Sequence, residues 1–561
     1  MKSNRRKFIQ ILGSGAAGLT LGTSAITLTS CSSTSAKKED EDGQILFIGD
    51  NIAVAETTNG KVRGFIHKDI YNFLGIPYGA NTIGKNRFMP PQKPDPWKDI
   101  YPAVYWPNSA PQLLDNFYAN RYLAFTDYWH YDDVSENCLG INVWTLGYKD
   151  NTKRPVLLWI HGGGFTSGNS IEHPEYHGEN LSRQGDIVFC SLNHRLGPLG
   201  FSDFSGVGGE RYAASGNVGI LDIKAALEWI HDNISNFGGD PNNVTIMGQS
   251  GGGAKVCTLV SLRSAKGLFH KAVALSGNIT RALDKEFSEK MGAYILKEAG
   301  LSFSQIDKLQ EMPWMDYYAL SSKASARITK DTGGSGMLRG NFGPVADEIN
   351  LPKGLFFSDT DDYSAKITMI ISSTFYERSP SAFDSSLENI TLEEAKVKIK
   401  TITGYSAVGD KGPQIIDAYS KCFPDRKPIV ILSMVLSNRQ QVIITADAKI
   451  KQPAPVYLAW FGWNPPLFDG RLRAFHTMDI GFWFNNTDVQ ISHSGGGARP
   501  RNLATNMSGT LVQFMKTGSP NGGGLPEWPK YTAINGETMI LDYVCEVKND
   551  PDREARKSLP V

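Results

Sequence analysis

A serine between glycines is the residue of this sequence whose setting most suggests chemistry. Ser250 lies in Gly248-Gln249-Ser250-Gly251-Gly252, directly after the apolar run 244–247. This pattern is typical of a sharp turn between a strand and a helix that presents a nucleophile. Glycines suit such a turn because a side chain would crowd a strained backbone. A glycine-rich turn is also a common tight connection, so this motif alone does not establish an active site.

A catalytic serine needs a base within hydrogen-bond reach, because its hydroxyl is a poor nucleophile at neutral pH. Of the ten histidines, only His476 and His493 follow the last expected core strand, which ends at Phe461. His476 is the candidate base. His493 lies in Ser492-His493-Ser494-Gly495-Gly496, a sequence typical of a mobile surface.

A second glycine-rich turn, His161-Gly162-Gly163-Gly164-Phe165, follows the strand expected to end at Ile160. Glycines leave backbone N–H groups free to point at a developing oxyanion. In an open parallel sheet, ligands bind beyond the carboxyl ends of the strands. The serine, the candidate base and this turn each follow a predicted strand, so we expect them at one edge of the sheet.

The elements that must position these residues are strands alternating with helices. Continuous apolar runs predict parallel strands buried on both faces at 156–160, 187–192, 244–247, 271–275, 367–371 and 456–461. A buried helix is expected over 219–234, and a more polar helical insertion over 286–325 that forms a lid or wall. Short strands over 53–78 predict a small antiparallel start, and 90–106 predicts a surface loop.

The 561 residues carry 57 basic and 57 acidic side chains, so no overall field attracts nucleic acid or anionic lipid. Five cysteines follow Cys31, and none has the spacing of a zinc or redox site. Cys190 and Cys257 lie in apolar runs and are expected to be small core residues. Neither a metal nor a structural disulfide is predicted.

The N-terminus carries paired arginines, Arg5 and Arg6, ahead of a Gly/Ala-rich apolar segment that ends at Cys31. It resembles a twin-arginine export signal closed by a lipoprotein cleavage box, with Cys31 as the lipidated residue. The alternative is a membrane anchor, but its glycines and threonines make a poor spanning helix. We therefore expect a signal over 1–31, a flexible tether over 32–50, and a membrane-anchored protein of the bacterial cell envelope.

Taken in order, the motifs of the chain resemble the type-B carboxylesterase and cholinesterase family of α/β-hydrolases. The resemblance covers nearly everything after the tether and implies one catalytic domain over 51–561. Its fold would be a large, mostly parallel sheet with helices on both faces and a small N-terminal antiparallel part. The motifs lie at 72–78, 135–139, 162–165, 193–197, 216–222, 236–241, 248–252, 474–476, 518–521 and 527–529.

The resemblance implies a Ser-Glu-His triad in that chain order, with no cofactor. The acid matches Glu377 in Ser373-Thr374-Phe375-Tyr376-Glu377-Arg378, where Arg378 replaces the family's usual glycine. A cation there could compete with the histidine for Glu377, so Asp361 and Asp362 remain alternative acids. The resemblance also assigns the oxyanion donors to the N–H groups of three glycines: Gly163, Gly164 and Gly251.

Other positions bear on the substrate. Gln249 stands where the family commonly has glutamate, which removes a negative charge beside the pocket. With Gln249 neutral and Trp129 imperfectly placed for a quaternary ammonium, choline esters are not the expected substrate. Gln249, Trp129 and Phe165 are the candidate pocket residues.

Two further positions concern the scaffold. The family's usual disulfide partner of Cys138 is replaced by Ala110, and Glu136 and Arg195 match residues that form a structural ion pair in relatives. The leading hypothesis is thus an ester hydrolase acting on a small-molecule substrate. The alternatives are a non-catalytic adhesion or binding protein on the same fold, and an amidase or lactonase that uses the same triad. Oligomeric state stays open.

Overall fold

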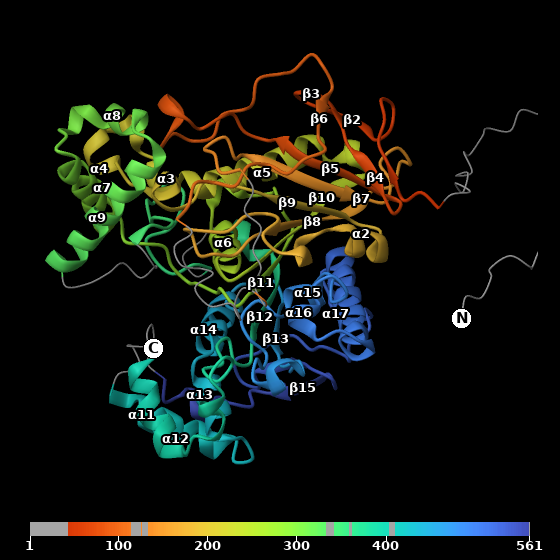
Figure 1. The fold of residues 1–561 in the computed structure, drawn as a ribbon, viewed down its shortest axis with the longest axis vertical. Coiled ribbons are helices and arrows are strands. Elements are labelled where there is room, and N and C mark those ends of the chain that lie inside the picture. The colour runs from red at the N-terminus through yellow and green to blue at the C-terminus, as the bar shows by residue number, and fades with distance from the viewer. Residues whose placement is uncertain are drawn as a thin grey trace, which may run out of the picture. The chain divides into compact units, whose positions relative to one another are not determined.

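A computed structural model describes residues 43–113, 125, 133–332, 341–357, 362–402 and 410–559. The described residues from Ile45 onward belong to one compact unit, drawn in colour in Figure 1. The predicted export signal with Cys31, the aromatic Trp129 and the alternative acid Asp361 lie outside the described residues.

Twelve strands of the described chain form one sheet, and its central part is parallel (Figure 1). Neighbouring strands run parallel from β9 to β14, and the pairs at both margins are antiparallel. Their spatial order is β1 (Leu46–Phe47), β4 (Phe65–His67), β5 (Ile70–Pro77), β7 (Gly140–Thr145), β9 (Val188–Leu192), β8 (Arg154–Ile160), β10 (Gly239–Gln249), β11 (Lys271–Leu275), β12 (Thr368–Thr374), β13 (Val456–Phe461), β14 (Glu537–Leu541) and β15 (Glu546–Asn549).

All six predicted apolar runs form strands of the parallel part, β8 to β13. The order of β8 and β9 is reversed in space, which is a crossover that apolar runs do not reveal. β7 and β14 were not predicted. β1, which pairs with β4, lies within 32–50, the segment predicted to be a flexible tether. The small antiparallel start is confirmed, with β2 (Val54–Thr57) and β3 (Gly60–Arg63) joined by β6 (Tyr101–Pro102) in a second sheet.

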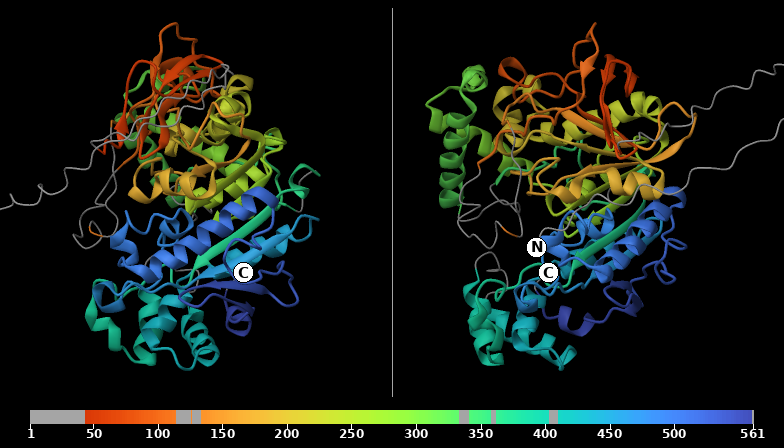
Figure 2. Two further views of the ribbon diagram at one scale, coloured as in Figure 1. Left: turned by 90° about the vertical axis from the view of Figure 1, so that its right-hand side faces the viewer. Right: turned by 45° about the vertical axis from the view of Figure 1, so that its right-hand side comes forward.

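Both faces of the sheet are covered by helices, as Figure 2 shows. Successive strand side chains point to opposite faces, so Val156, Leu158 and Ile160 belong to one apolar core and Leu157 and Trp159 to the other. This burial on both sides is why the strands are continuously apolar. The helices are α2 (Glu179–Gly185), α3 (Gly197–Phe201), α4 (Ser205–Gly208), α5 (Val218–Asn233), α6 (Gly251–Val260), α7 (Lys285–Ala299), α8 (Ile306–Glu311), α9 (Trp314–Thr332), α10 (Asp362–Ala365), α11 (Leu392–Lys398), α12 (Gly412–Cys422), α13 (Pro428–Val435), α14 (Arg439–Lys449), α15 (Ile480–Trp483), α16 (Ile491–Ser494), α17 (Ala498–Thr517) and α18 (Arg553–Arg556).

The predicted helix over 219–234 is α5, and the helical insertion comprises α7, α8 and α9 between β11 and β12. The hydroxyl of Tyr318 on α9 donates to the backbone oxygen of Leu196 at 3.1 Å. Leu196 lies just beyond the carboxyl end of β9, so the insertion forms a wall beside that edge of the sheet.

The predicted ion pair between Glu136 and Arg195 is wrong, although both residues are buried scaffold. Arg195 pairs with Asp222 at 2.6 Å, while Glu136 pairs with Arg87 at 2.5 Å. Asp222 also accepts a hydrogen bond from the backbone N–H of Arg195 at 3.0 Å, which fixes that pair within the turn. The sequence shows charged residues but not which buried carboxylate faces which guanidinium.

Among the described residues, no single helix is both long and apolar enough to cross a bilayer. α13 and α14 reach that length and apolarity only together, as a pair bent by 41°.

Candidate active site

Ser250 occupies a strained turn between β10 and α6, which has the strand-to-helix form that the sequence predicts. Its backbone has φ 56° and ψ −126°, a conformation that costs a non-glycine residue about 1–3 kcal/mol. Its N–H donates to the carbonyl of Leu275 at 2.8 Å. A Cβ at Gly252 would lie 2.0 Å from the carbonyl oxygen of Ile160, so a larger residue would displace the turn.

The predicted oxyanion turn lies directly against this serine turn. Gly163 and Gly164 have φ of 78° and 63°, which favour glycine. A Cβ at Gly251 would lie 2.4 Å from the nitrogen of Gly164, so only glycine allows this approach. Within the described chain, the N–H groups of Gly163, Gly164 and Gly251 have no hydrogen-bond acceptor. Three donors are therefore available beside the serine.

The predicted acid and base are brought together from 99 residues apart in sequence. Nδ1 of His476 lies within hydrogen-bond distance of Oε2 of Glu377, and the His476 N–H donates to the Glu377 carbonyl at 2.9 Å. The Glu377 side chain is 3% exposed and that of His476 is 34% exposed. The carboxylate thus contacts the imidazole ring through Nδ1.

The acid is held by the end of its own strand. The N–H of Thr374 donates to Oε1 of Glu377 at 3.1 Å, and the Thr374 hydroxyl accepts from the Glu377 N–H at 3.0 Å. Glu377 itself has φ 38°, so this short turn points the carboxylate back toward the sheet edge. With both oxygens engaged, the carboxylate is fixed for the histidine.

Gln249 connects the serine turn to the histidine. Its amide nitrogen lies 3.4 Å from both ring nitrogens of His476, and its side chain is only 1% exposed. Because Gln249 directly precedes Ser250, this contact links His476 to the serine turn. A neutral amide therefore lies against the imidazole where a carboxylate would add negative charge.

Arg378 does not compete with His476 for the carboxylate of Glu377. Arg378 is exposed, and no ion pair joins it to Glu377 in the described structure. Asp362 begins α10, ahead of the amino end of β12, whereas Glu377 follows the carboxyl end of that strand. Of these two candidate acids, only Glu377 lies at the edge that carries Ser250.

The candidate pocket residues separate in the structure. Gln249 faces the site, and Phe165 is buried with its ring 5.4 Å from that of Phe201. Trp129 cannot be placed because it lies outside the described residues.

Lys255, on α6, is a buried residue that sequence reasoning missed. Its ammonium donates to the carbonyl oxygens of His161 at 3.0 Å and Gly162 at 3.3 Å. Burial lowers the pKa of Lys255 to about 7. The signal was a single charge within the apolar run 254–260, a placement that requires buried acceptors. Lys255 thus ties the helix after the nucleophile to the oxyanion turn.

We expect Lys255→Met to lower kcat about 10- to 100-fold with a much smaller change in KM. The loss of both hydrogen bonds would let the glycine turn shift, and displacements of about 1 Å can cost on that order. Steady-state kinetics on a p-nitrophenyl ester would measure it, with exposed Lys266→Met as the matched control. Parent-like kcat in folded Lys255→Met would contradict this role.

Two buried acids, Asp479 and Glu175, and the buried His493 lie near the Glu377–His476 pair. Burial, and then the charge of Glu377, raises the pKa of Asp479 to about 7. His493 is 1% exposed, with Nδ1 3.3 Å from Oε2 of Glu175 and its ring 5.1 Å from that of Phe475. The expectation of a mobile surface around His493 is therefore wrong. Gly495 ends the short helix α16 in a left-handed conformation, and His493 on that helix is buried.

Among the described residues, no group of three or more His, Cys, Asp or Glu could hold a metal ion. Cys138, Cys190, Cys257, Cys422 and Cys545 are all free thiols. Cys190 and Cys257 are fully buried in one apolar core, as predicted.

Known proteins of similar sequence include esterases and other hydrolases. The model of the carboxylesterase family matches residues 51–557. The para-nitrobenzyl esterase of Bacillus subtilis (strain 168) is 30% identical over 524 residues, which cover 90% of this chain and 98% of that protein. The phenmedipham hydrolase of Pseudarthrobacter oxydans is 29% identical over 527 residues, covering 90% and 99%.

A solved structure gives the same result for the fold. It is an esterase from anaerobic Clostridium hathewayi, described as able to hydrolyze aliphatic aromatic polyesters. The two structures match with a TM-score of 0.79 at 31% identity, over 92% of this chain and 99% of that one.

Proposed function

This chain belongs to the carboxylesterase family and is a carboxylic ester hydrolase, and on that premise we propose that Ser250, His476 and Glu377 are its catalytic triad. The observation that supports it most is the convergence of a strained serine turn and a Glu377–His476 pair at one sheet edge. Gln249 bridges the two parts.

In the proposed acylation step, the Ser250 hydroxyl attacks the ester carbonyl while Nε2 of His476 accepts its proton. Glu377 holds Nδ1 and stabilises the imidazolium that forms. His476 then gives the proton to the departing alcohol, which leaves an acyl group on Ser250. The strained turn supports this role because it holds the serine side chain clear of the helix that follows.

The developing oxyanion would be held by the N–H groups of Gly163, Gly164 and Gly251. Each loss of one such donor typically costs about 10²- to 10³-fold in turnover. Lys255 supports their placement from behind, through the carbonyls of His161 and Gly162. Water then hydrolyses the acyl-enzyme by the reverse proton route, with His476 as the base.

We propose small or medium uncharged esters as the substrates. Gln249 is neutral and lies against the base, so no carboxylate at that position attracts a cationic alcohol group. The name of the para-nitrobenzyl esterase, 30% identical to this chain, supports a neutral alcohol part.

Hydrolysis of p-nitrophenyl butyrate by protein lacking residues 1–31 tests this function. We expect saturable release of p-nitrophenol at a rate well above that of buffer, and butyrylcholine hydrolysed at a kcat/KM at least about tenfold lower. A folded protein that cleaves neither ester would contradict the proposal. Faster cleavage of butyrylcholine would contradict the substrate class.

We further propose that the chain is exported through its paired arginines and anchored by lipid on Cys31. The supporting feature is the order of Arg5, Arg6, the Gly/Ala-rich segment and Cys31 in the sequence. The neighbouring Lys37-Lys38-Glu39-Asp40-Glu41-Asp42 would then belong to a solvated tether that ends near β1.

To test the lipid anchor, the full chain is expressed in a bacterium, and its partitioning into the detergent phase and its mass are measured. The parent should enter the detergent phase. For Cys31→Ala, no cleaved form should be found in the detergent phase, because the variant lacks the thiol that carries the lipid. Ser32→Ala is the matched control and should behave as the parent. Identical partitioning and mass of Cys31→Ala and the parent would contradict the anchor.

A further inference from the structure

Two neighbouring loops carry the acid and the base. The acid's loop, 375–388, follows β12, and the base's loop, 462–476, follows β13, which pairs with β12 in parallel. The loops meet where Phe475 forms an isolated β-bridge with Glu377 and the His476 N–H donates to the Glu377 carbonyl at 2.9 Å. The alignment of the acid with the base therefore depends on what else joins these two loops.

A buried guanidinium crosses from one loop to the other. Arg473 belongs to the base's loop, three residues before the histidine, and is only 4% exposed. Its Nη1 donates to the hydroxyls of Ser379 and Ser381, each at 2.7 Å. Its Nη2 donates to both carboxylate oxygens of Glu388, at 2.8 and 2.9 Å. All three partners belong to the acid's loop, so Arg473 joins that loop to the base's loop.

Further hydrogen bonds close the same network. The carbonyl of Arg471 accepts from the Ser379 hydroxyl at 2.6 Å and from Nη1 of Arg473 at 2.9 Å, and the Ser381 hydroxyl donates to Oε2 of Glu388 at 2.8 Å. Burial raises the pKa of Glu388, but the hydrogen bonds from Arg473 and Ser381 lower that pKa more, so it lies below its usual range. The carboxylate is therefore charged at neutral pH. We call these five residues the Arg473 clamp.

The backbone of both loops is strained beside the acid and the base. Glu377, Arg473 and Thr477 have φ of 38°, 55° and 79°, which are left-handed values that residues other than glycine rarely adopt. Such conformations persist only where the surrounding structure holds them. The two loops therefore rely on contacts such as those of the Arg473 clamp to keep their shape.

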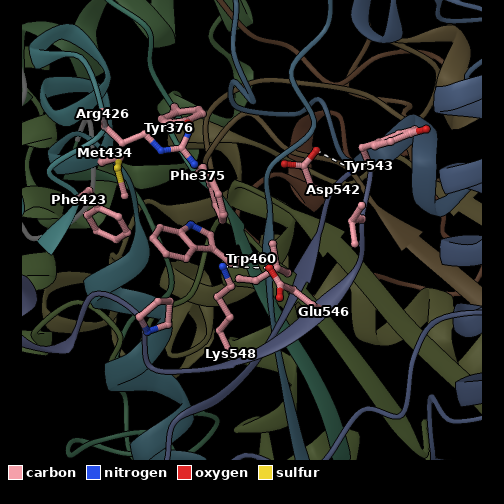
Figure 3. A pocket seen from close by; sticks show the side chains of 13 residues that line it. Phe375, Tyr376, Phe423, Arg426, Met434, Trp460, Asp542, Tyr543, Glu546 and Lys548 are labelled. Carbon is pink, nitrogen blue, oxygen red and sulfur yellow. Dashed lines mark hydrogen bonds and ion pairs between the residues drawn. The ribbon is translucent and has the colours of Figure 1, made fainter.

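Packing supports the acid's turn only in part. Phe375 and Tyr376, which directly precede Glu377, line a cavity of about 410 Å³ (Figure 3). Side chains beside a cavity lack packing partners on that side. Polar contacts, those of Thr374 and those of the Arg473 clamp, therefore carry more of the task of orienting Glu377.

We propose that Arg473 is a positioning residue for the Glu377–His476 pair, a role that rests on the proposed function of that pair. The Arg473 clamp fixes the acid's loop against the base's loop, which keeps the carboxylate aligned with Nδ1 of the imidazole. Arg473 takes no part in the proton transfers. A guanidinium suits this task because its donors lie in a fixed plane and hold several acceptors at once, whereas lysine offers a point charge on a flexible stem.

Arg473→Gln in the full-length protein is expected to lower kcat for p-nitrophenyl butyrate by about 10- to 100-fold, because misplacement by about 1 Å can cost on that order. KM should change by less than about threefold, since proton transfer is affected rather than substrate binding. Glu388→Gln should lower kcat less. The double variant should lose no more than about twofold beyond Arg473→Gln, because the two side chains act as one unit.

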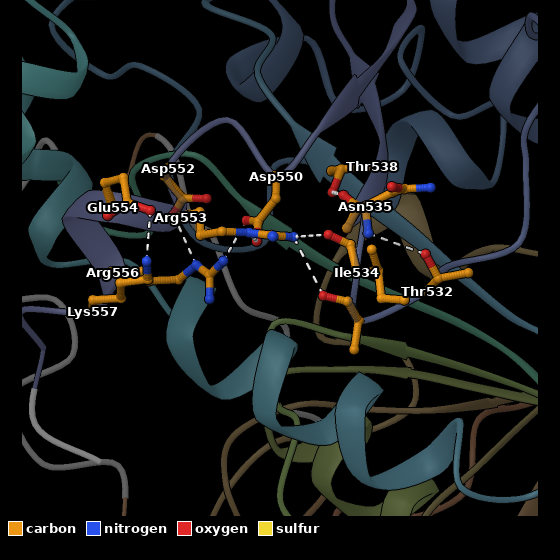
Figure 4. A network of polar contacts seen from close by, with 12 residues as sticks. Thr532, Ile534, Asn535, Thr538, Asp550, Asp552, Arg553, Glu554, Arg556 and Lys557 are labelled. Atoms are coloured by element: carbon orange, nitrogen blue, oxygen red, sulfur yellow. Dashed lines mark hydrogen bonds and ion pairs between the residues drawn. The ribbon is translucent and has the colours of Figure 1, made fainter.

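Arg553→Gln is the matched control for the loss of an arginine network. Arg553 donates to Asp550 at 2.7 Å and to the carbonyl oxygens of Ala533 and Ile534 at 3.3 and 2.7 Å (Figure 4). Residues 533 and 534 precede β14, so this network lies at the amino ends of the parallel strands, opposite to the edge that carries the triad. In this variant kcat should stay within about twofold of the parent.

A p-nitrophenyl phosphonate ester separates positioning from folding. Ser250 displaces p-nitrophenolate from phosphorus while His476 takes the serine proton, so the rate of release depends on an aligned base and the final amount on the number of folded sites. Arg473→Gln should release p-nitrophenolate about 10- to 100-fold more slowly than the parent, to the same final amount per chain.

Parent-like kcat in Arg473→Gln, or an equal loss in Arg553→Gln, would overturn the proposal. A parent-like release rate with a lower final amount would overturn it as well, because that result assigns Arg473 to folding alone. A parent protein that releases no p-nitrophenolate would refute the proposed triad and, with it, any positioning role. That failure appears in the parent, whereas failure of the positioning role alone appears only in the variants.

Discussion

Ser250→Ala is expected to lower kcat for p-nitrophenyl butyrate by about 10⁴- to 10⁶-fold, since removing the nucleophile of such a triad costs on that order. The residual rate would come from the oxyanion donors and substrate binding. Alanine has the same backbone constraint as serine at φ 56°, so the turn should persist and the melting temperature should stay close to that of the parent. Spectrophotometric assays of p-nitrophenol release would measure the rates of the parent and of Ser250→Ala, with a high enzyme concentration for the variant.

Ser276→Ala is a matched control for this variant. Ser276 is also buried at positive φ, 48°, and follows β11 at the same edge of the sheet. Its hydroxyl lies outside the proposed chemistry, so turnover should stay within about threefold of the parent. Comparable losses in Ser250→Ala and Ser276→Ala would show that the serine turn matters through folding alone.

The second large effect is expected at the acid. Glu377→Gln should lower kcat by about 10³- to 10⁴-fold, because a neutral amide neither fixes the required histidine tautomer nor stabilises the imidazolium. The geometry should survive, since an amide oxygen can still accept from the N–H of Thr374. A pH–rate profile of kcat/KM, with the melting temperature, would separate lost electrostatics from lost structure.

Two neighbours serve as controls for the acid. Arg378→Gln should retain parent-like turnover, because Arg378 is exposed and forms no ion pair with Glu377 in the described structure. Asp362→Asn should do likewise, since α10 lies ahead of the amino end of β12. Parent-like turnover in Glu377→Gln, or a large loss in Asp362→Asn, would refute the assignment of Glu377.

The sequence allowed good prediction wherever burial acts on a whole element. Strands covered on both faces must be apolar throughout, so β8 to β13 were recognisable as continuous runs. β7 contains Asn142 between apolar residues, and β14 begins with Glu537 and Thr538, so neither forms such a run. Their positions depend on pairing partners that periodicity does not encode.

Prediction of individual side-chain contacts was less successful, because these depend on three-dimensional neighbours. Arg195 turns to Asp222 and Glu136 to Arg87, although either guanidinium could match either carboxylate by charge. His493 was expected at a mobile surface on account of its glycines, yet its ring is buried against Phe475. Lys255 could have been noticed as an isolated charge in an apolar helix, but its acceptors lie 93 and 94 residues upstream.

The site also shows how local constraints combine into function. Gly252 permits the close approach of the serine turn to β8, and Gly251 permits that of the oxyanion turn. Thr374 holds Glu377, and Glu377 holds His476 through both its carboxylate and its backbone carbonyl. Each contact is short-range, but together they bring residues from four strands to one edge before a substrate binds.

The most direct test of the central claim is to identify the residue that becomes covalently modified. A p-nitrophenyl phosphonate ester should release one p-nitrophenolate per chain, abolish hydrolysis of p-nitrophenyl butyrate in parallel, and leave its phosphonyl group on the peptide that contains Ser250, as mass spectrometry would show. Ser250→Ala should remain unlabelled. Labelling of a different residue, or full labelling of Ser250 with hydrolysis retained, would contradict the account.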